Sequence, residues 1–259
     1  MKTFWIIVKN NMLITLAYRW NIMSSIVLMI IQMIVGLFVW IVIIDQSGPI
    51  NGYYHDDMVT YFLLGAFISV VFSSSHFFRL SSLVRNGVFN MYLIRPYSFL
   101  ADSAAQFLGS KIIDALLTLM LTLIFLATGL ATWPSLNILG LFLFLSNFLL
   151  LFMFGAFLSC FSFWLIQMWP LKPLYNAMMA ILGGNLYPLD LLPAIWFRVI
   201  HFTPFPLFGY VNTKLLQGKL EYHDLQYYVL LSCCWLVVFS IGYKWLFMKG
   251  LRKYEGVNA

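Results

Sequence analysis

Charged side chains are scarce in this sequence of 259 residues. Only 9% of the residues are Asp, Glu, Lys or Arg, whereas 62% are hydrophobic and 19% are aromatic. So little polar surface cannot cover a water-soluble globule of this size. The net charge of +6 does not indicate nucleic-acid binding, because the basic residues lie in short gaps between apolar runs instead of forming one cluster. The composition therefore predicts a membrane protein.

Motifs for enzymatic chemistry are also missing. Cys160, Cys233 and Cys234 lie in apolar runs without the spacing of a disulfide framework or a metal site, and the histidines form no HExxH pair. No GxSxG sequence occurs, and Gly218-Lys219 does not complete a P-loop. We therefore expect no catalytic, cofactor-binding or metal-binding residues and no enzymatic activity in this chain. ATP-driven work would need a nucleotide site on another protein.

Long apolar runs are what the sequence has in abundance. A helix needs about 20 apolar residues to cross the hydrocarbon core of a bilayer. Residues 1–259 are expected to form a single all-α transmembrane domain with six spans. We place these spans at residues 22–44, 58–78, 104–131, 136–166, 173–187 and 225–247.

The distribution of basic residues gives the orientation. With six spans and a cytoplasmic N-terminus, eleven Lys and Arg residues fall on the cytoplasmic side and three outside, while Lys111 lies within a span. We therefore expect both termini in the cytoplasm. The eleven are Lys2, Lys9, Arg19, Arg79, Arg85, Arg95, Lys172, Lys244, Lys249, Arg252 and Lys253, and the three are Arg198, Lys214 and Lys219.

Two segments outside the spans have an amphipathic pattern. In residues 1–20, apolar side chains recur at roughly helical spacing, which predicts a helix in the inner headgroup layer; a partly ordered lead-in is the alternative. Residues 188–206 follow Gly183-Gly184 and contain several prolines, so we expect a broken segment that dips into the outer leaflet without crossing it.

Polar and small residues within the spans suggest helix contacts. Gly65, Ser69 and Ser73 are four residues apart, a spacing that lets a neighbouring helix approach closely, either within the chain or from a second chain. Lys111 and Asp114 lie three residues apart on neighbouring helix surface. A structural ion pair is the favoured interpretation, and a proton-coupled carrier site is the alternative.

Residues 79–100 read RLSSLVRNGVFNMYLIRPYSFL and form the inner loop between the second and third spans. The three arginines are expected on the cytoplasmic side, but the apolar residues between them are too many for a solvated loop. Gly87 permits a tight turn and Pro96 ends a helix. We therefore predict a short helix, at about residues 88–95, that lies across the inner face and meets a protein partner or the membrane.

This loop is where a family resemblance becomes specific. VRNGVFNMYLIRPYS resembles the cytoplasmic loop of six-span bacterial permeases of the type 2 ATP-binding cassette (ABC-2) family, which have a glycine followed by Leu-x-Arg-Pro. The later run GGNLYPLDLLPAIWFRVIHFTPF is similar to that group's series of Gly-Gly, Pro, Leu-Pro, Trp and Pro-Phe. Together with the six-span pattern, the resemblance covers nearly the whole chain.

The resemblance implies that the loop carries a coupling helix for a separate cytoplasmic ATPase. One departure concerns Asn90, which stands where members often have a carboxylate, so a charged contact there is not expected. The residues implied in coupling are Arg85, Asn86 and Gly87 before the helix, Phe89, Met91, Tyr92 and Leu93 facing the ATPase groove, and Arg95 and Pro96 closing it.

The resemblance also implies the remaining parts of a transporter. It implies a permease subunit of an exporter in the bacterial cytoplasmic membrane, driven by a P-loop ATPase dimer that binds the ATP and Mg²⁺, and paired with a second, identical or related permease chain. The substrate would be an amphipathic or hydrophobic peptide, lipid or drug. The outer gate would comprise Gly183, Gly184, Pro188, Pro193, Trp196 and Pro204.

Two other functions are compatible with the sequence. An ATP-independent carrier or channel-like protein would use Lys111 and Asp114 as its coupling residues. A membrane scaffold or immunity protein would transport nothing. A cytoplasmic ATPase partner is the property that separates the exporter from the carrier.

Overall fold

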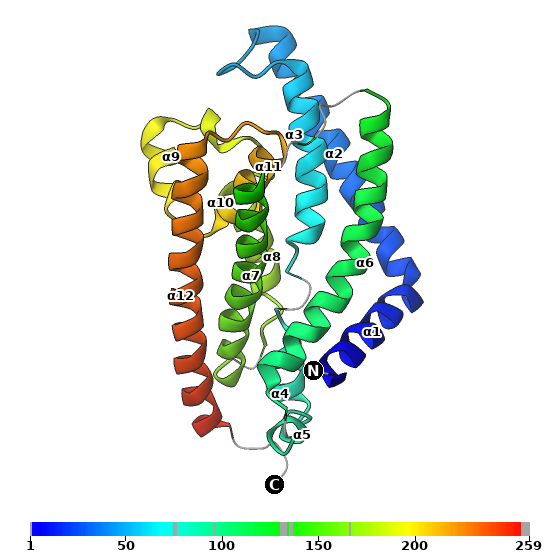
Figure 1. Ribbon diagram of the computed structural model, residues 1–259, viewed down its shortest axis with the longest axis vertical. Helices are drawn as coiled ribbons and strands as arrows, with labels where there is room; N and C mark the ends of the chain where they lie inside the picture. The colour runs from blue at the N-terminus through cyan, green and yellow to red at the C-terminus, as the bar shows by residue number, and fades with distance from the viewer. Residues whose placement is uncertain are drawn as a thin grey trace.

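A computed structural model gives the fold as a bundle of helices (Figure 1). It describes residues 2–74, 77–95, 97–129, 134, 137–165 and 167–254, without the side chain of Arg19. These residues form helices and loops with no named β-strand. The helices are α1 (Lys2–Ala17), α2 (Arg19–Ser47), α3 (His55–Val71), α4 (Arg79–Arg85), α5 (Asn90–Leu93), α6 (Phe99–Ala127), α7 (Ile138–Ser159), η1 (Cys160–Phe163), α8 (Leu171–Ile181), η2 (Leu189–Leu191), α9 (Ala194–His201), α10 (Phe205–Phe208), α11 (Tyr210–Leu216) and α12 (Tyr222–Lys253).

Four stretches of the described residues are long and apolar enough to cross a membrane. They are Trp20–Ser47, Phe99–Ala127, Ile138–Phe163 and Tyr222–Lys253. The predicted class, an all-α protein with several membrane-spanning helices, is therefore confirmed.

The other two predicted spans are shorter than expected. α3 has 17 residues and α8 has 11, which correspond to about 25 Å and about 16 Å of helix against about 30 Å of hydrocarbon. α3 ends at Val71; the amide of Phe72 makes a last hydrogen bond to the carbonyl of Ile68, and the carbonyl of Val70 accepts from Lys111 of α6. The six-span count and the domain boundaries stay predictions.

The core lies between α3, α7, the short helices α10 and α11, and α12. α12 packs along the whole of α7 and reaches η1. Aromatic rings fill this space: Phe154 of α7 has its ring centroid 5.6 Å from that of Phe208 and 5.0 Å from that of Phe239. Edge-to-face and tilted rings at these distances are favourable, so the core holds α7 between the short helices and α12.

The N-terminal helix α1 lies against the first half of α6 (Figure 1). The contact depends on Gly109, where a Cβ atom would lie 2.5 Å from the carbonyl oxygen of Val8 and 2.8 Å from the Cβ of Asn11. Val8 is buried, whereas Trp5 and Leu16 are exposed. α1 is thus joined to α6 and leaves an apolar face outward; its place in the headgroup layer stays a prediction.

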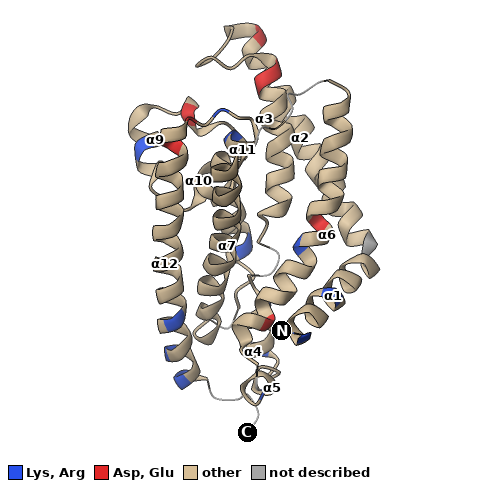
Figure 2. Ribbon diagram, viewed as in Figure 1, with Lys and Arg blue, Asp and Glu red and all other residues tan. Residues whose placement is uncertain are grey.

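Charges gather at opposite ends of the bundle (Figure 2). Lys and Arg cluster where α1, α5 and the end of α12 lie, while most Asp and Glu lie at the other end, around the start of α3 and near α9. We name these the basic end and the acidic end. α4 and α5 are at the basic end, and α9 and α11 are at the acidic end (Figure 1).

Candidate coupling segment and acidic-end junction

The segment from α4 to α5 has a sharper turn than the sequence predicts. α4 ends at Arg85, and Gly87 takes a positive φ of 68° that favours glycine. The amide of Phe89 then donates to the carbonyl of Leu83, 3.1 Å away, which folds the chain back on α4. The predicted helix at residues 88–95 is therefore reduced to the four residues of α5, because this turn uses the residues before it.

Phe89 is the anchor of this segment. It is 0% exposed and packs with Leu80 and Phe163. Its ring centroid lies 5.4 Å from that of Phe99, 6.3 Å from that of Phe247 and 5.3 Å from that of Tyr254. The prediction that Phe89 faces an ATPase groove is therefore wrong, since its ring is enclosed by η1, α6 and the end of α12.

Arg79 ties α5 to the start of α6. Its Nη2 atom donates to the hydroxyl of Tyr92 at 2.7 Å and to Oδ2 of Asp102 at 2.8 Å. The Asp102 side chain is largely buried and also accepts a hydrogen bond from Gln106 at 2.9 Å. Charge-assisted hydrogen bonds of this kind are about twice as strong as neutral ones. The partly buried Tyr92 thus belongs to an internal clamp, rather than standing free for a partner.

An apolar strip remains exposed on the outside of the segment. Ile94 is 84% exposed, and Val88, Met91 and Leu93 are also exposed. Arg85, Asn86, Asn90 and Arg95 are exposed around them, and the Arg95 guanidinium lies 4.7 Å from the ring centroid of Tyr92. Met91 and Leu93 are thus accessible, as a docking role requires. Ile94 is the most exposed of these residues, but it is not among the coupling residues predicted from the sequence. Pro96 lies outside the described residues. We call Val88, Met91, Leu93 and Ile94 the exposed strip.

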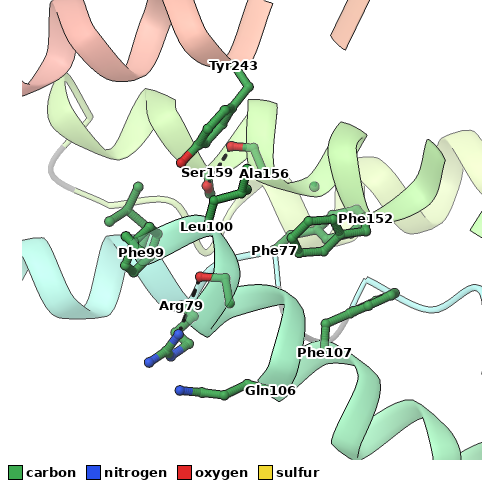
Figure 3. Close-up of a pocket in the computed structure, with 13 residues that line it drawn as sticks. Phe77, Arg79, Phe99, Leu100, Gln106, Phe107, Phe152, Ala156, Ser159 and Tyr243 are labelled. Carbon is green, nitrogen blue, oxygen red and sulfur yellow. Dashed lines mark hydrogen bonds between the residues drawn. The ribbon is translucent and has the colours of Figure 1, made fainter. Parts of the chain in front are cut away.

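A small cavity lies behind this segment (Figure 3). Its volume is about 30 Å³, and its lining comes from α4, α6, α7 and α12, including Arg79, Gln106, Phe152 and Tyr243. The segment is therefore anchored through Phe89 and Arg79 but does not fill the space between α6 and α7. A cavity of this size has room for about one water molecule.

The predicted ion pair of Lys111 and Asp114 is not among the ion pairs of the described residues. Lys111 is 2% exposed, and its Nζ donates to the carbonyl of Val70 at 3.0 Å and to the hydroxyl of Ser73 at 2.6 Å. A cation is favoured there because the carbonyl end of a helix carries negative partial charge. Lys111 thus holds the end of α3 against α6.

The three small residues of α3 do not form one packing face. Gly65 lies against Thr213 of α11, whose Oγ1 would be 3.8 Å from an added Cβ. Ser69 and Ser73, in contrast, line a groove beside α6, and Ser73 lies beyond the end of α3. The predicted close helix contact is therefore limited to Gly65.

The predicted outer segment is broken as expected. Pro188 precedes η2, Pro193 precedes α9, and Pro204 precedes α10. α9 exposes Ile195, Trp196 and Val199, as does Phe202 directly after it, while Ile200 is buried. An apolar face at one end of a bundle is suited to a membrane surface. The gating role of this segment stays a prediction.

Gly183 and Gly184 form a turn that joins three helices. Gly184 has a φ of 79°, its carbonyl accepts a 2.6 Å hydrogen bond from Tyr61 of α3, and the carbonyl of Gly183 accepts one of 2.7 Å from the amide of Tyr210. A Cβ on Gly209 would lie 2.2 Å from the carbonyl oxygen of Gly183. The backbones of Gly183 and Gly209 are in direct contact, so Gly209 has no room for a side chain.

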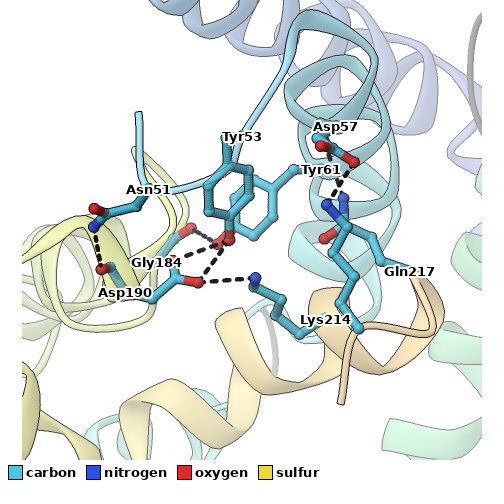
Figure 4. A network of polar contacts seen from close by, with 9 residues as sticks. Asn51, Tyr53, Asp57, Tyr61, Gly184, Asp190, Lys214 and Gln217 are labelled. Atoms are coloured by element: carbon cyan, nitrogen blue, oxygen red, sulfur yellow. Dashed lines mark hydrogen bonds and ion pairs between the residues drawn. The ribbon is translucent and has the colours of Figure 1, made fainter. Parts of the chain in front are cut away.

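A polar junction at the acidic end was not predicted (Figure 4). Lys214 is 7% exposed, and its Nζ lies 2.8 Å from Oδ2 of Asp190 and 4.5 Å from the ring centroid of Tyr53. The hydroxyl of Tyr53 lies 2.9 Å from both carboxylate oxygens of Asp190. Burial, followed by the Asp190 charge, raises the pKa of Tyr53, so this phenol stays a hydrogen-bond donor.

A second pair lies beside it. Lys219 forms an ion pair with Asp57, and Gln217 donates to the backbone carbonyl of Asp57 at 3.0 Å (Figure 4). The junction thus ties the start of α3 and the loop before it to η2 and α11. Sequence counting recorded Lys214 and Lys219 only as outer charges, because their partners are distant along the chain.

His201 gives this end a dependence on pH. It stacks on Tyr227 of α12 at 4.9 Å between ring centroids, and its Nδ1 lies 3.2 Å from the hydroxyl of Tyr228. Burial lowers the pKa of His201, and nearby Asp224 opposes that shift. Below about pH 6.5 the unfolded histidine binds a proton that the folded one resists, so stability falls as the pH falls.

We expect the thermal unfolding midpoint of the purified chain to decrease when the pH is lowered from about 7.5 to about 5.5. The decrease should be smaller in His201→Gln. Unfolding monitored by circular dichroism in detergent would measure this difference. An equal fall in both proteins would mean that His201 is not responsible.

The described residues hold no group of three or more His, Cys, Asp or Glu side chains that could bind a metal ion. They form a polytopic helical membrane protein. At its basic end a clamped segment exposes apolar side chains, and at the opposite end lies a broken helical segment.

A family model described as ABC-2 family transporter protein matches residues 5–257. The chain therefore belongs to the ABC-2 transporter family, which confirms the resemblance. No curated protein matches the chain.

Proposed function

We propose that this chain is the permease subunit of an ATP-driven ABC-2 exporter, docked through the exposed strip to a separate P-loop ATPase dimer. The single observation that carries the proposal is the strip itself: apolar side chains are held outward at the basic end by a buried anchor and a charged clamp. Exposed apolar groups in a charged rim are typical of protein interfaces.

The positive-inside rule supports a cytoplasmic location for the basic end. Both termini and the strip then face the cytoplasm of a bacterial cell, where the ATPase binds ATP and Mg²⁺. The segment 188–206 then lies at the outer surface, where it acts as a gate. A second permease chain, identical or related, completes the transporter.

The internal contacts supply a route for coupling. Movement of the docked ATPase displaces α4 and α5. The contacts of Phe89 and Arg79 transmit this displacement to α6, η1 and α12. Nucleotide binding thereby shifts the population of the bundle between two access states. The substrate is an amphipathic or hydrophobic molecule.

The triple variant Met91→Ser, Leu93→Ser, Ile94→Ser tests the docking. We expect the tagged chain, solubilised gently from its own cells, to lose its captured P-loop ATPase and the associated ATP hydrolysis by at least about tenfold, because hot-spot side chains at interfaces each contribute about 1–2 kcal/mol or more. Mass spectrometry and an ATPase assay of the eluate are the measurements.

The matched control is Ile195→Ser, Trp196→Ser, Val199→Ser, which removes an equally exposed apolar face at the acidic end. This control should keep the ATPase. Equal ATPase capture by the strip variant and the wild-type chain would refute the docking surface. A chain that never captures an ATPase would favour an ATP-independent carrier.

A further inference from the structure

A large groove runs beside α6, in the middle of the bundle. Its volume is about 840 Å³, and its walls come from α2, α3, α6 and α8. Pockets of about 300–1,000 Å³ are the size that encloses a drug-sized molecule. The groove is therefore large enough to hold an amphipathic ligand, not only a few water molecules.

The lining of the groove divides into a polar and an apolar part. Amide and hydroxyl side chains are contributed by Gln32, Ser69, Asn176 and Asn185, whereas most of the α2 lining is aliphatic. Such a mixture fits a ligand with a polar head and an apolar body, because each part then finds matching groups.

Asp114 carries the one formal charge among the described residues that line the groove. The ion pairs of the described residues use Asp45, Asp57, Asp102 and Asp190, but not Asp114. No hydrogen bond to its carboxylate is found among them either. Lys111, three residues before Asp114, instead donates to the carbonyl of Val70 and the hydroxyl of Ser73, two residues that also line the groove, so its ammonium group is engaged at the groove wall.

Asp114 lies deep within a membrane-spanning helix, where a charged side chain raises the free energy of the folded protein. It lies fifteen residues into α6, about 22 Å along the helix from Phe99. A carboxylate at that depth in a membrane-spanning helix is expensive, and such groups line pathways or binding cavities. The groove gives Asp114 an opening that a cation can enter.

The longest wall of the groove comes from one helix. α2 forms its outer wall, and the opposite face of α2 exposes large apolar side chains such as Ile34 and Phe38. Toward the acidic end, the indole of Trp40 donates to the carbonyl of Leu186 at 3.0 Å and closes the wall against the turn after α8. α2 thus contributes one wall of the groove and an exposed apolar surface on its other side.

We infer that this groove is a binding site for amphiphiles with a positively charged head, with Asp114 as the counter-charge and the α2 wall against the apolar body. The inference rests on the proposed function, because it names the substrate class of the exporter. Anionic amphiphiles are disfavoured, because the one charged side chain among the described lining residues is a carboxylate and the ammonium of Lys111 is already hydrogen-bonded to Val70 and Ser73.

The test uses the purified full-length chain in phosphatidylcholine nanodiscs, with no ATPase present. Binding of dodecyltrimethylammonium, dodecanol and dodecyl sulfate is measured by calorimetry and corrected with empty nanodiscs. Wild-type protein should bind the ammonium compound best. Asp114→Asn should weaken its binding by about tenfold and leave dodecanol unchanged, whereas Asp114→Glu should retain most of the affinity.

Asp56→Asn is the matched control, because it removes an exposed carboxylate at the acidic end outside the groove. Met29→Trp is the second variant: its larger side chain projects into the groove and should weaken binding of both the ammonium compound and dodecanol. It also keeps the inference testable if Asp114→Asn fails to fold.

The inference is overturned if wild-type protein shows no preference for the ammonium compound, if Asp114→Asn binds it equally well, or if Met29→Trp changes nothing. These results are distinguishable from failure of the proposed function, because the binding assay contains no ATPase and the ATPase capture needs no ligand.

Discussion

Phe89→Ala is expected to abolish ATPase capture without touching the exposed strip. Removing a fully buried phenylalanine side chain costs about 3–5 kcal/mol, since it loses apolar burial and leaves a cavity. Here the loss falls on the contacts that join α5 to η1, α6 and α12. The strip would then keep its side chains but lose its fixed geometry.

Two measurements check this expectation. Thermal or chemical unfolding in detergent should show a large loss of stability for Phe89→Ala, and affinity capture should show loss of the ATPase. Phe202→Ala is the control, because it removes the same type of side chain from an exposed position at the acidic end, outside the strip. Phe89→Leu should restore part of both properties. If Phe89→Ala captures the ATPase as well as the wild-type chain does, the buried anchor has no role in docking.

Asp190→Asn is expected to give the second large effect. The Lys214 cation is buried, and removing the partner of a buried ion costs about 3–5 kcal/mol because an uncompensated charge remains. The Asp190 side chain is about one-third exposed, so solvent screening places the expected cost near the lower end of that range, about 3 kcal/mol. Tyr53 loses a charged acceptor at the same time.

A double variant separates the charge from the packing. Lys214→Met combined with Asp190→Leu removes both charges and should recover most of the stability lost in Asp190→Asn. Lys219→Met is the comparison, because the pair of Lys219 and Asp57 is more exposed and should contribute at most about 1 kcal/mol. A loss in Asp190→Asn no larger than in Lys219→Met would contradict the buried pair.

The long helices were predictable because a bilayer imposes a length on apolar runs. α2 and α12 contain the predicted runs at residues 22–44 and 225–247, whereas α6 and α7 overlap the runs at 104–131 and 136–166 but end before those runs do. The end of α3 was not predictable, since it depends on Ser73 and on a hydrogen bond from Lys111 of another helix. An i,i+3 spacing suggested an ion pair for Lys111, but a tertiary contact with α3 took its ammonium group.

The residue types of the sequence were enough to locate the candidate coupling segment. They did not show which of its side chains face the protein core and which face outward. A short segment with alternating aromatic and apolar residues looks the same whether an aromatic ring faces a partner or its own chain. Phe89 faces inward because Phe163, Phe247 and Tyr254 surround it, and these residues are far away in the sequence. The same distance hid the pair of Lys214 and Asp190 from charge counting.

The enclosure of Phe89 also has a consequence for the order of folding. Phe163, Phe247 and Tyr254, three of the rings around it, lie far beyond it along the chain. Contacts between residues so distant in sequence close large loops, whose entropy must be lost before the contact forms. The turn after α4 can therefore form early, whereas α5 gains its fixed position only after η1 and the end of α12 have packed.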